Sequence, residues 1–295
     1  MNAYRIARIP EDARLDTEQL GSKPKFWVFF EGHRWLFKEA RINTGEDWAE
    51  KVAAEIAKAI GIRAATVELA QYAGRRGSIS LNFVDVDAGG ALVHGNEILA
   101  LQVTGYDKGK MFQQSDHTLE NIRIAIQGLF GQVADPILTE LAGYLVLDAL
   151  IGNTDRHHEN WGLVVQVQRE ARKASLTVAP SYDHASSLGR ELRDDRRVEL
   201  LTANRVDSYI RKGRGGIFRE SEKRHGENPL RLVQVAARTY PSYFRDALER
   251  VAALDANVVV RIVDSLPDEC ASDPAKRFAK AMILNARVSL QEILK

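Results

Sequence analysis

The chain has 295 residues, enough for one large core or two lobes, and its 45% hydrophobic content is typical of a globular protein. Its 41 Lys and Arg against 40 Asp and Glu give a net charge of +1, so no global field attracts nucleic acid or an anionic membrane. The single cysteine, Cys270, excludes an internal disulfide and suits a reducing compartment. No apolar run approaches the roughly 18 residues of a membrane span, and the start of the chain lacks a signal-peptide core. We therefore expect a cytoplasmic protein that neither enters a membrane nor binds nucleic acid directly.

The first regular elements in chain order are two paired strands, at residues 26–30 and 34–38, joined by a tight turn at residues 31–33. Lys38 closes the second strand, where a lysine can bind the α- and β-phosphates of a nucleotide. Most lysines at strand ends are simply solvated, so the surrounding sequence must decide between the two interpretations.

A helix is predicted next. Thr44 is a good N-cap, Asp47 follows three residues later, and Gly61 ends the helix after Ile60. Its apolar stripe consists of Trp48, Val52 and Ile56. Such a helix could supply the carboxylate that holds Lys38 in place. Further on, residues 78–84 alternate between polar and apolar side chains and predict another strand.

Residues 136–150 form a helical apolar pattern that stops at Gly152. Directly after it, Asp155 and Asn160 stand five residues apart, with His157 two after the aspartate. An aspartate can take or orient the proton of a substrate hydroxyl, and an asparagine oxygen can hold Mg²⁺ on the phosphates of ATP. A lone Asp in such a loop could merely cap a turn, but the surrounding His and Asn favour a phosphotransferase loop.

A hairpin follows the loop, with strands at residues 161–167 and 176–180 and a turn at 169–174. It leads to Asp183, a second oxygen ligand for Mg²⁺. Zinc is disfavoured at His157 and His158, because adjacent histidines cannot share one helix face as an i, i+4 pair does.

These segments together resemble the HipA-like kinases of bacteria. The resemblance is carried by the loop at 152–160, by Tyr182-Asp183 in place of Asp-Phe-Gly, and by residues 36–39, 44–55, 92–97 and 273–279 in the same order. The Asp-Arg-His-x-x-Asn pattern is also similar to phosphatidylinositol kinases, and Asp-Arg-His-His to four-jointed-type secretory kinases. The resemblance to HipA-like kinases runs from about Gly21 onward.

The resemblance implies an α/β, two-lobed protein-kinase-like fold, with a small mixed N-terminal lobe and a mainly helical C-terminal lobe. We expect residues 1–295 to form a single kinase domain, with the lobes at about 1–84 and 85–295. It implies ATP and Mg²⁺ as cofactors, transfer of phosphate to a Ser or Thr hydroxyl of a protein, and a DNA-binding antitoxin partner for toxic members.

The same resemblance assigns residues around the nucleotide. Lys38 would bind phosphates and join Asp155 and His157 as catalytic residues, while Asn160 and Asp183 would hold the metal. The resemblance also implies that His157 is a buried organiser of the loop, and we prefer this interpretation of it. The lysine's partner would be Glu50 by family register, although apolar periodicity favours Glu55. A phosphate loop would include Gly21 and Ser22, and the adenine would lie beside Leu81, Asn82 and Phe83.

Three questions stay open at this stage. A lipid or small-molecule kinase, or a nucleotide-binding pseudokinase that serves as an interaction module, would carry similar motifs. Glu18 stands where HipA autophosphorylates a serine, and Thr17 is the nearest hydroxyl, so whether the chain inactivates itself stays open. The basic run at residues 211–216 could receive a substrate or a nucleic acid, although mixed charge is usually a solvated face.

Overall fold

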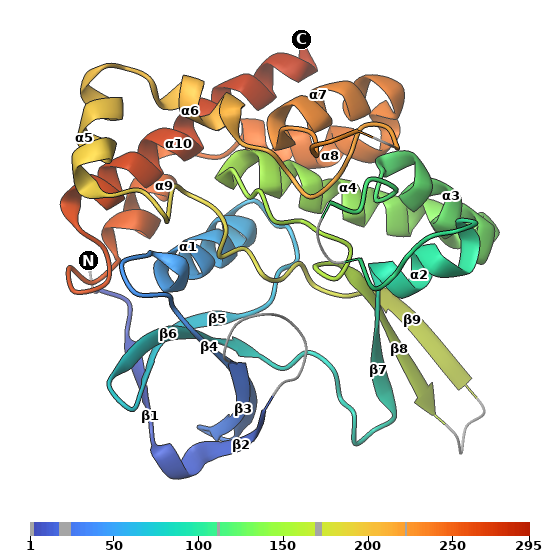
Figure 1. Ribbon diagram of the computed structural model, residues 1–295, viewed down its shortest axis with the longest axis horizontal. Helices are drawn as coiled ribbons and strands as arrows, with labels where there is room; N and C mark the ends of the chain where they lie inside the picture. The colour runs from blue at the N-terminus through green and yellow to red at the C-terminus, as the bar shows by residue number, and fades with distance from the viewer. Residues whose placement is uncertain (1–2, 18–24, 111–112, 169–172, 222) are drawn as a thin grey trace. The chain divides into compact units, whose positions relative to one another are not determined.

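The computed structural model describes residues 3–17, 25–110, 113–168, 173–221 and 223–295. They form two compact units (Figure 1). Unit 1 consists of Met1–Asn82, Asp183–Tyr209 and Leu254–Asn285, and unit 2 of Phe83–Tyr182, Ile210–Ala253 and Ala286–Lys295. The chain therefore leaves unit 1 after Asn82 and re-enters it at Asp183. The lobe limits expected from the sequence stay a prediction.

Unit 1 contains a curled six-stranded sheet in the order β1-β5-β6-β4-β3-β2. The strands are β1 (Ile6–Ile9), β2 (Arg14–Thr17), β3 (Lys25–Phe30), β4 (His33–Glu39), β5 (Val67–Tyr72) and β6 (Arg75–Leu81), with the 3-10 turn η1 (Glu11–Ala13) between the first two. β1 pairs in parallel with β5, and the other neighbours are antiparallel. The core of this sheet is made by Ala7, Ile9, Phe26, Val28, Phe37, Ala70 and Ile79.

The predicted hairpin at the start of the sheet is confirmed. β3 and β4 pair from Lys25 opposite Lys38 to Phe30 opposite His33. Glu31 and Gly32 make the turn with φ angles of 49° and 79°. Two consecutive positive φ angles suit the right-handed twist of a two-residue hairpin, and the glycine accepts this conformation without strain.

Helix α1 (Glu46–Ala59) packs on β5 and β6 of the sheet and buries Trp48, Val52 and Ile56, as the apolar stripe predicted. It ends as expected, since Ile60 is the C-cap and Gly61 follows with a φ of 63°. The expected N-cap is wrong. Gly45 occupies that position, and the Thr44 hydroxyl instead donates to the carbonyl oxygen of Arg41. Trp48 explains the glycine, because a Cβ at position 45 would lie 2.1 Å from the indole ring.

The predicted strand at 78–84 is shorter than expected. β6 ends at Leu81, and beyond it the Asn82 amide makes one further hydrogen bond to β4, at the carbonyl oxygen of Arg34. The remaining helices that begin in unit 1 are α5 (Asp194–Thr202), α6 (Val206–Lys212), α9 (Ala256–Asp264) and α10 (Asp273–Gln291); the last turns of α6 and α10 are counted in unit 2.

Unit 2 contains a three-stranded antiparallel sheet of β7 (Gly90–His94), β8 (Gly162–Gln168) and β9 (Lys173–Val178). β8 and β9 are the predicted hairpin, which is confirmed with limits shifted by a few residues. The helices of this unit are α2 (Gly95–Gln102), α3 (Leu119–Phe130), α4 (Ala134–Ile151), α7 (Pro229–Thr239) and α8 (Pro241–Ala252), with the short 3-10 turns η2 (Gly131–Val133) and η3 (Glu292–Leu294).

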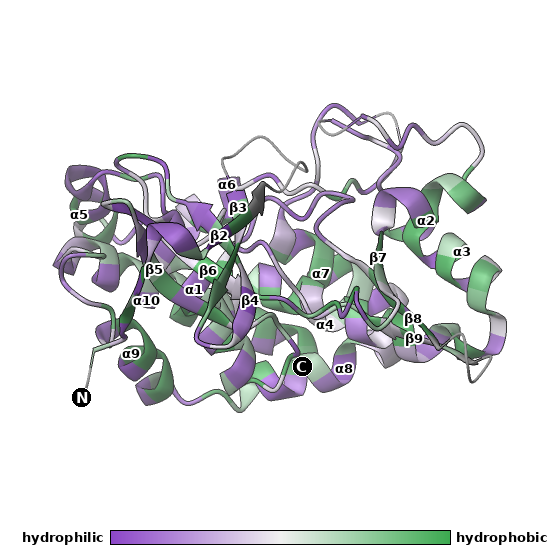
Figure 2. Ribbon diagram, turned by 90° about the horizontal axis from the view of Figure 1, so that it is seen from below, coloured by the Kyte–Doolittle hydropathy of each residue, from purple (hydrophilic) through white to green (hydrophobic). Residues whose placement is uncertain are grey.

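Helix α4 is the central helix of unit 2. It packs against α3, α7 and α8, and every residue from Leu141 to Ile151 is buried. A helix that is apolar on all sides, such as α4, must be covered by other elements on all sides. Helix α3 is covered on one face alone, and it shows separate green and purple patches in Figure 2. Burial fixes α4 and therefore the start of the loop that follows it. Among the described residues, no helix is long and apolar enough to cross a membrane.

Candidate active site

The loop after α4 is anchored at its first residues. Gly152 adopts a left-handed conformation, with a φ of 67°, and its amide donates to the carbonyl oxygen of Asp148, which ends the helix as predicted. Asn153 then donates from Nδ2 to Oδ1 of Asp148 at 2.8 Å, while its Oδ1 accepts the amide of Asp155 at 3.1 Å. The position of Asp155 is thus set by a buried side chain from the end of α4.

A buried ion pair holds the middle of the loop. Arg156 donates from Nε and Nη2 to the two carboxylate oxygens of Asp148 at 2.7 and 2.8 Å, and also from Nη2 to Ser181 Oγ at 2.9 Å. Both charged side chains are only 4% exposed. A bidentate pair of this kind satisfies both partners, whereas removal of either would leave a buried charge alone. The guanidinium also donates to the carbonyl oxygen of Asn160, so the same pair fixes the end of the loop.

Asp155 and Asn160, the predicted base and metal ligand, lie together. Asn160 Nδ2 donates to the backbone carbonyl oxygen of Asp155 at 2.6 Å. This orients the buried amide and leaves its Oδ1, a hard oxygen donor, as the atom suited to Mg²⁺. The half-buried Asp155 lines a pocket of about 190 Å³ within unit 2.

The structure distinguishes the two histidines of the loop. His157 is half-buried rather than buried, accepts the amide of Glu159 at Nδ1 and lines the pocket beside Asp155, and its role as an organiser of the loop stays a prediction. His158 is the buried one, at 1% exposure, and its Nδ1 lies 2.8 Å from the Tyr106 hydroxyl. Burial lowers the pKa of His158 to about 4, so it is neutral at physiological pH.

Sequence reasoning missed His117, which joins the loop to the rest of the unit. Its Nδ1 donates to the carbonyl oxygen of Gly216 at 2.9 Å, and its Nε2 accepts the indole N–H of Trp161 at 3.1 Å. Burial lowers the pKa of His117 to about 3, and this bonding pattern uses one donor and one acceptor of a neutral ring. A lone histidine 38 residues before Asp155 carries no local signal of this role.

Unit 1 brings together the other predicted residues. Lys38, on β4, donates from Nζ to Oδ1 of Asp183 at 3.0 Å, although 145 positions separate them in the chain. Asp183 has a φ of 61°, which is uncommon for a residue other than glycine and marks a position fixed by its surroundings. An ammonium beside a carboxylate is suited to bind a phosphate and a cation, respectively.

Glu50 on α1 is the carboxylate near this pair. Its Oε1 accepts the backbone amide of His184 at 3.0 Å, and its Oε2 is buried without a hydrogen-bond partner among the described residues. Burial acts to raise the pKa of Glu50, but the Lys38 ammonium and His184 outweigh it and hold that pKa below its usual range. Glu55 instead accepts from Lys51 at 2.8 Å. The structure thus places Glu50, rather than Glu55, in the electrostatic neighbourhood of Lys38.

The remaining predicted nucleotide residues are partly described. Leu81 ends β6, and Asn82 and Phe83 follow at the point where the chain passes from unit 1 to unit 2. The Phe83 ring stacks on Tyr182 with their centroids 5.7 Å apart. Gly21 and Ser22 lie outside the described residues. In the part of the chain that the structure describes, no three His, Cys, Asp or Glu side chains form a metal-binding group, and Mg²⁺ on a nucleotide needs fewer protein ligands.

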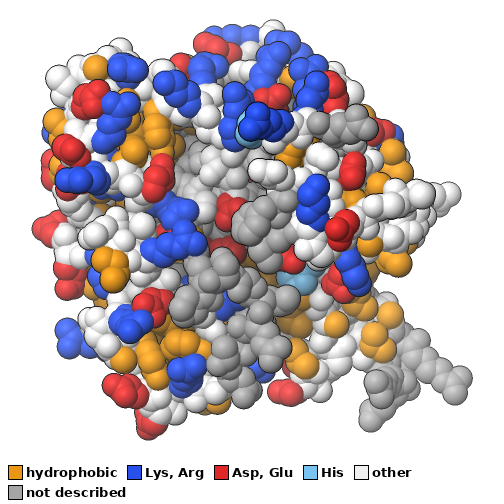
Figure 3. Space-filling model, in the orientation of Figure 1, with side chains coloured by type: hydrophobic (Ala, Val, Ile, Leu, Met, Phe, Trp, Pro, Cys, Tyr) orange, Lys and Arg blue, Asp and Glu red, His pale blue; other side chains and the backbone are white. Residues whose placement is uncertain are grey.

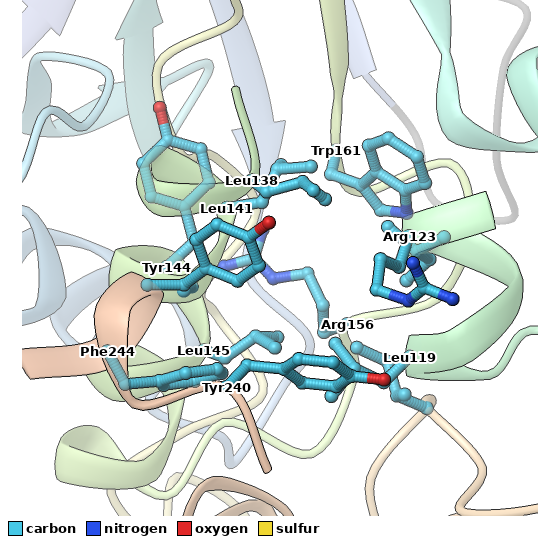
Figure 4. Close-up of a pocket in the computed structure, with 14 residues that line it drawn as sticks. Leu119, Arg123, Leu138, Leu141, Tyr144, Leu145, Arg156, Trp161, Tyr240 and Phe244 are labelled. Carbon is cyan, nitrogen blue, oxygen red and sulfur yellow. The ribbon is translucent and has the colours of Figure 1, made fainter. Parts of the chain in front are cut away.

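Unit 2 also contains a smaller, apolar pocket of about 40 Å³ (Figure 4). Aliphatic and aromatic side chains from α3, α4 and α8 surround it, and Arg156 and Trp161 reach it from the loop region. No carboxylate lines it. It therefore lacks a group that could take a proton, in contrast to the pocket at Asp155.

Comparison with known proteins agrees with this fold. The model of the HipA-like C-terminal domain family matches residues 19–251, and the chain belongs to that family. It is similar to the Helicobacter pylori proinflammatory kinase CtkA, with 19% sequence identity, a TM-score of 0.76 and 94% of each chain covered. It is also similar to HipA of Shewanella oneidensis MR-1, solved with HipB and operator DNA, with 12% identity, a TM-score of 0.57, and 96% of this chain and 65% of that chain covered.

These likenesses confirm the α/β, two-lobed kinase-like fold class predicted from the sequence. No curated protein sequence matches the chain closely enough to count as a relative.

Proposed function

We propose that the protein transfers the γ-phosphate of ATP to a Ser or Thr hydroxyl of a protein substrate, in a reaction that requires Mg²⁺. The observation that carries this proposal is the pairing of Lys38 with Asp183 at 3.0 Å. The sequence suggested phosphate binding for Lys38 and metal binding for Asp183 on separate grounds. An ordinary ion pair on the surface would not need a buried carboxylate such as Glu50 close to its lysine.

Each residue has a role that its surroundings support. Asp155 takes the proton of the acceptor hydroxyl as the new bond to phosphorus forms, and its carboxylate lines the pocket where an acceptor would lie. Lys38 binds phosphate oxygens, and the buried Glu50 carboxylate attracts its ammonium group. Asp183 and Asn160 would hold Mg²⁺ through side-chain oxygens, and the metal would supply neutralisation of phosphate charge.

His157 lies beside Asp155 in the same pocket and would contact the acceptor. Phe83, with Leu81 and Asn82, would lie beside the adenine, and Gly21 and Ser22 would contact phosphates. Because Phe83 is braced by Tyr182, the aromatic face is held in one orientation.

A transfer assay tests this proposal. Purified protein with Mg²⁺ and γ-labelled ATP is added to a bacterial lysate, and the Asp155→Ala variant serves as the control. We expect labelled protein bands with the wild type alone. Label in the lipid or small-molecule fraction instead would favour the corresponding kinases, and ATP binding without any transfer would favour a pseudokinase.

The partner and compartment are proposed by analogy. The similar HipA chain was solved in a toxin–antitoxin complex with HipB and operator DNA. We propose that this chain also acts in the cytoplasm and is held by an antitoxin-like protein, which would provide the contact with DNA. Co-purification of a DNA-binding protein with the tagged chain from its own host would support this view, whereas recovery of the chain alone would contradict it.

A further inference from the structure

The pocket at Asp155 has more basic than acidic side chains in its lining. They include two arginines, Arg214 and Arg224, four histidines and a single carboxylate, that of Asp155 itself. The two guanidinium groups are the permanent positive charges of this lining.

Both arginines are exposed, and neither forms an ion pair or hydrogen bond within the described parts of the chain. Figure 3 shows Lys and Arg side chains gathered around a histidine over the segment between α6 and α7. Other arginines of the described chain do have a carboxylate partner, as the nearby Arg219 has in Glu220. Two unpaired guanidinium groups beside a candidate catalytic carboxylate are therefore available to an external anion.

The two arginines lie on a segment, residues 213–221 and 223–226, whose two ends are joined by hydrogen bonds. Asn228 donates from Nδ2 to the carbonyl oxygens of Ile210 and Gly213 at 2.8 and 3.0 Å, and its Oδ1 caps α7. The Gly215 amide donates to the carbonyl oxygen of Glu227, and the Glu227 amide to that of Ile217. These bonds hold the two arms of the segment together, with one arginine on each arm.

Glycine lets this segment approach the catalytic loop closely. A Cβ at Gly216 would lie 2.8 Å from the backbone of Arg156 and His157, so a larger residue would push the segment away. The Gly216 carbonyl oxygen also accepts from His117, which fixes the distance. The arginines are thus held at the wall of the pocket that contains Asp155.

We propose that this pocket selects a Ser or Thr whose neighbouring residues in the substrate protein are acidic, with Arg214 and Arg224 pairing with Asp or Glu on either side of the acceptor hydroxyl. The proposal rests on the kinase function proposed above. A polypeptide fits better than a small phosphorylated molecule, because both guanidinium groups are exposed on the pocket rim and on separate arms. A site for a single phosphate group would instead have several buried hydrogen-bond donors that point to one position.

The test is a map of phosphorylation sites in a dephosphorylated bacterial lysate treated with Mg²⁺ and ATP. The variants are the wild type, Asp155→Ala, the double variant Arg214→Glu with Arg224→Glu, and a matched double variant Arg238→Glu with Arg245→Glu. The last pair is exposed on α7 and α8, outside the pocket, and makes the same change in net charge. Thermal unfolding of every variant checks that it is folded.

We expect wild-type sites to be enriched in flanking Asp and Glu. On peptides synthesised from those sites, charge reversal in the pocket should lower kcat/KM about tenfold, and replacing their flanking acids by Lys should restore it. Arg238→Glu with Arg245→Glu should keep the wild-type preference. This exchange of preference is the decisive readout, because a merely structural defect would slow all peptides alike.

Two outcomes would overturn the inference. Sites without acidic enrichment, or a preference that survives charge reversal, would show that the arginines do not read the substrate, while the kinase function would stand. Absence of any site dependent on Asp155 would instead remove the proposed kinase function, and the inference with it.

Discussion

The candidate catalytic loop of unit 2 and the charged cluster of unit 1 are held in different ways. The loop is fixed by partners close in sequence: Asp148 lies eight residues before Arg156 and five before Asn153. The cluster combines a strand, a helix and a loop, with 145 positions between Lys38 and Asp183 and 134 between Glu50 and His184. The loop is therefore rigid by local bonding, whereas the geometry of the cluster depends on the whole of unit 1.

Asp155→Ala should have the largest effect on activity. Loss of the proposed general base is expected to lower kcat about a thousandfold, while affinity for ATP stays near that of the wild type, because the proposed phosphate-binding residues of unit 1 are unchanged. Steady-state transfer assays and calorimetric titration with ATP measure the two quantities. Equal loss of transfer and of ATP affinity would show that the loop and the cluster cannot be separated in this way.

Asp148→Ala tests the rigidity of the loop. It leaves Arg156 buried without its carboxylate, at a cost of about 3–5 kcal/mol in the free energy of unfolding. Thermal denaturation should show Tm lowered by roughly 10 °C. Asp246→Ala, which breaks an exposed pair with Arg250 on α8, is the matched control and should change Tm little. Similar shifts for both variants would contradict the role given to the buried pair.

Acid should destabilise the protein through His117. Its pKa is about 3 when folded against an ordinary 6.5, so the unfolded chain binds a proton that the folded chain rejects as pH falls from about 6.5 towards 3. Between pH 7 and pH 5 this removes about 2 kcal/mol of stability. Urea denaturation at the two pH values should show a correspondingly smaller loss for His117→Gln. The exposed His225→Gln should behave as the wild type, and an unchanged loss in His117→Gln would refute the assignment.

Glu50→Gln tests the charged cluster of unit 1, and its expected effect is the smallest of the four. The substitution keeps the shape but removes the charge that acts on Lys38, and we expect ATP affinity to fall about tenfold. Glu55→Gln is the control, since Glu55 pairs with Lys51, and its ATP affinity should stay within about twofold of the wild type. A larger loss of ATP affinity in Glu55→Gln than in Glu50→Gln would instead support Glu55 as the partner of Lys38, as apolar periodicity favoured.

The same contrast explains what the sequence could predict. The spacing of Asp155, His157 and Asn160 after a helix that ends at glycine is a local pattern, and the hairpins and α1 were likewise visible as periodicity and turn residues. The choice between Glu50 and Glu55 was not, because it depends on how α1 packs on the sheet. Nor could local patterns indicate that Asp148 is the partner of Arg156.

The basic run at 211–216 shows a second limit of sequence reasoning. Its composition fitted a solvated face as well as a binding site, because a run of mixed charges does not indicate whether its side chains face solvent or a pocket. Only the hydrogen bonds of Gly215, Gly216 and Asn228 place Arg214 beside Asp155. Long-range hydrogen bonds of this kind have no signature in a single sequence.

The burial of Cys270 makes the protein convenient for spectroscopy. This sole cysteine is 7% exposed, and burial raises the pKa of its thiol to about 11, so it is almost entirely unreactive at neutral pH. A cysteine introduced at the exposed position 219, between the two arginines of the pocket rim, would then be the only thiol that maleimide dyes modify. A fluorophore there would report the arrival of a peptide directly, without any cysteine having first to be removed.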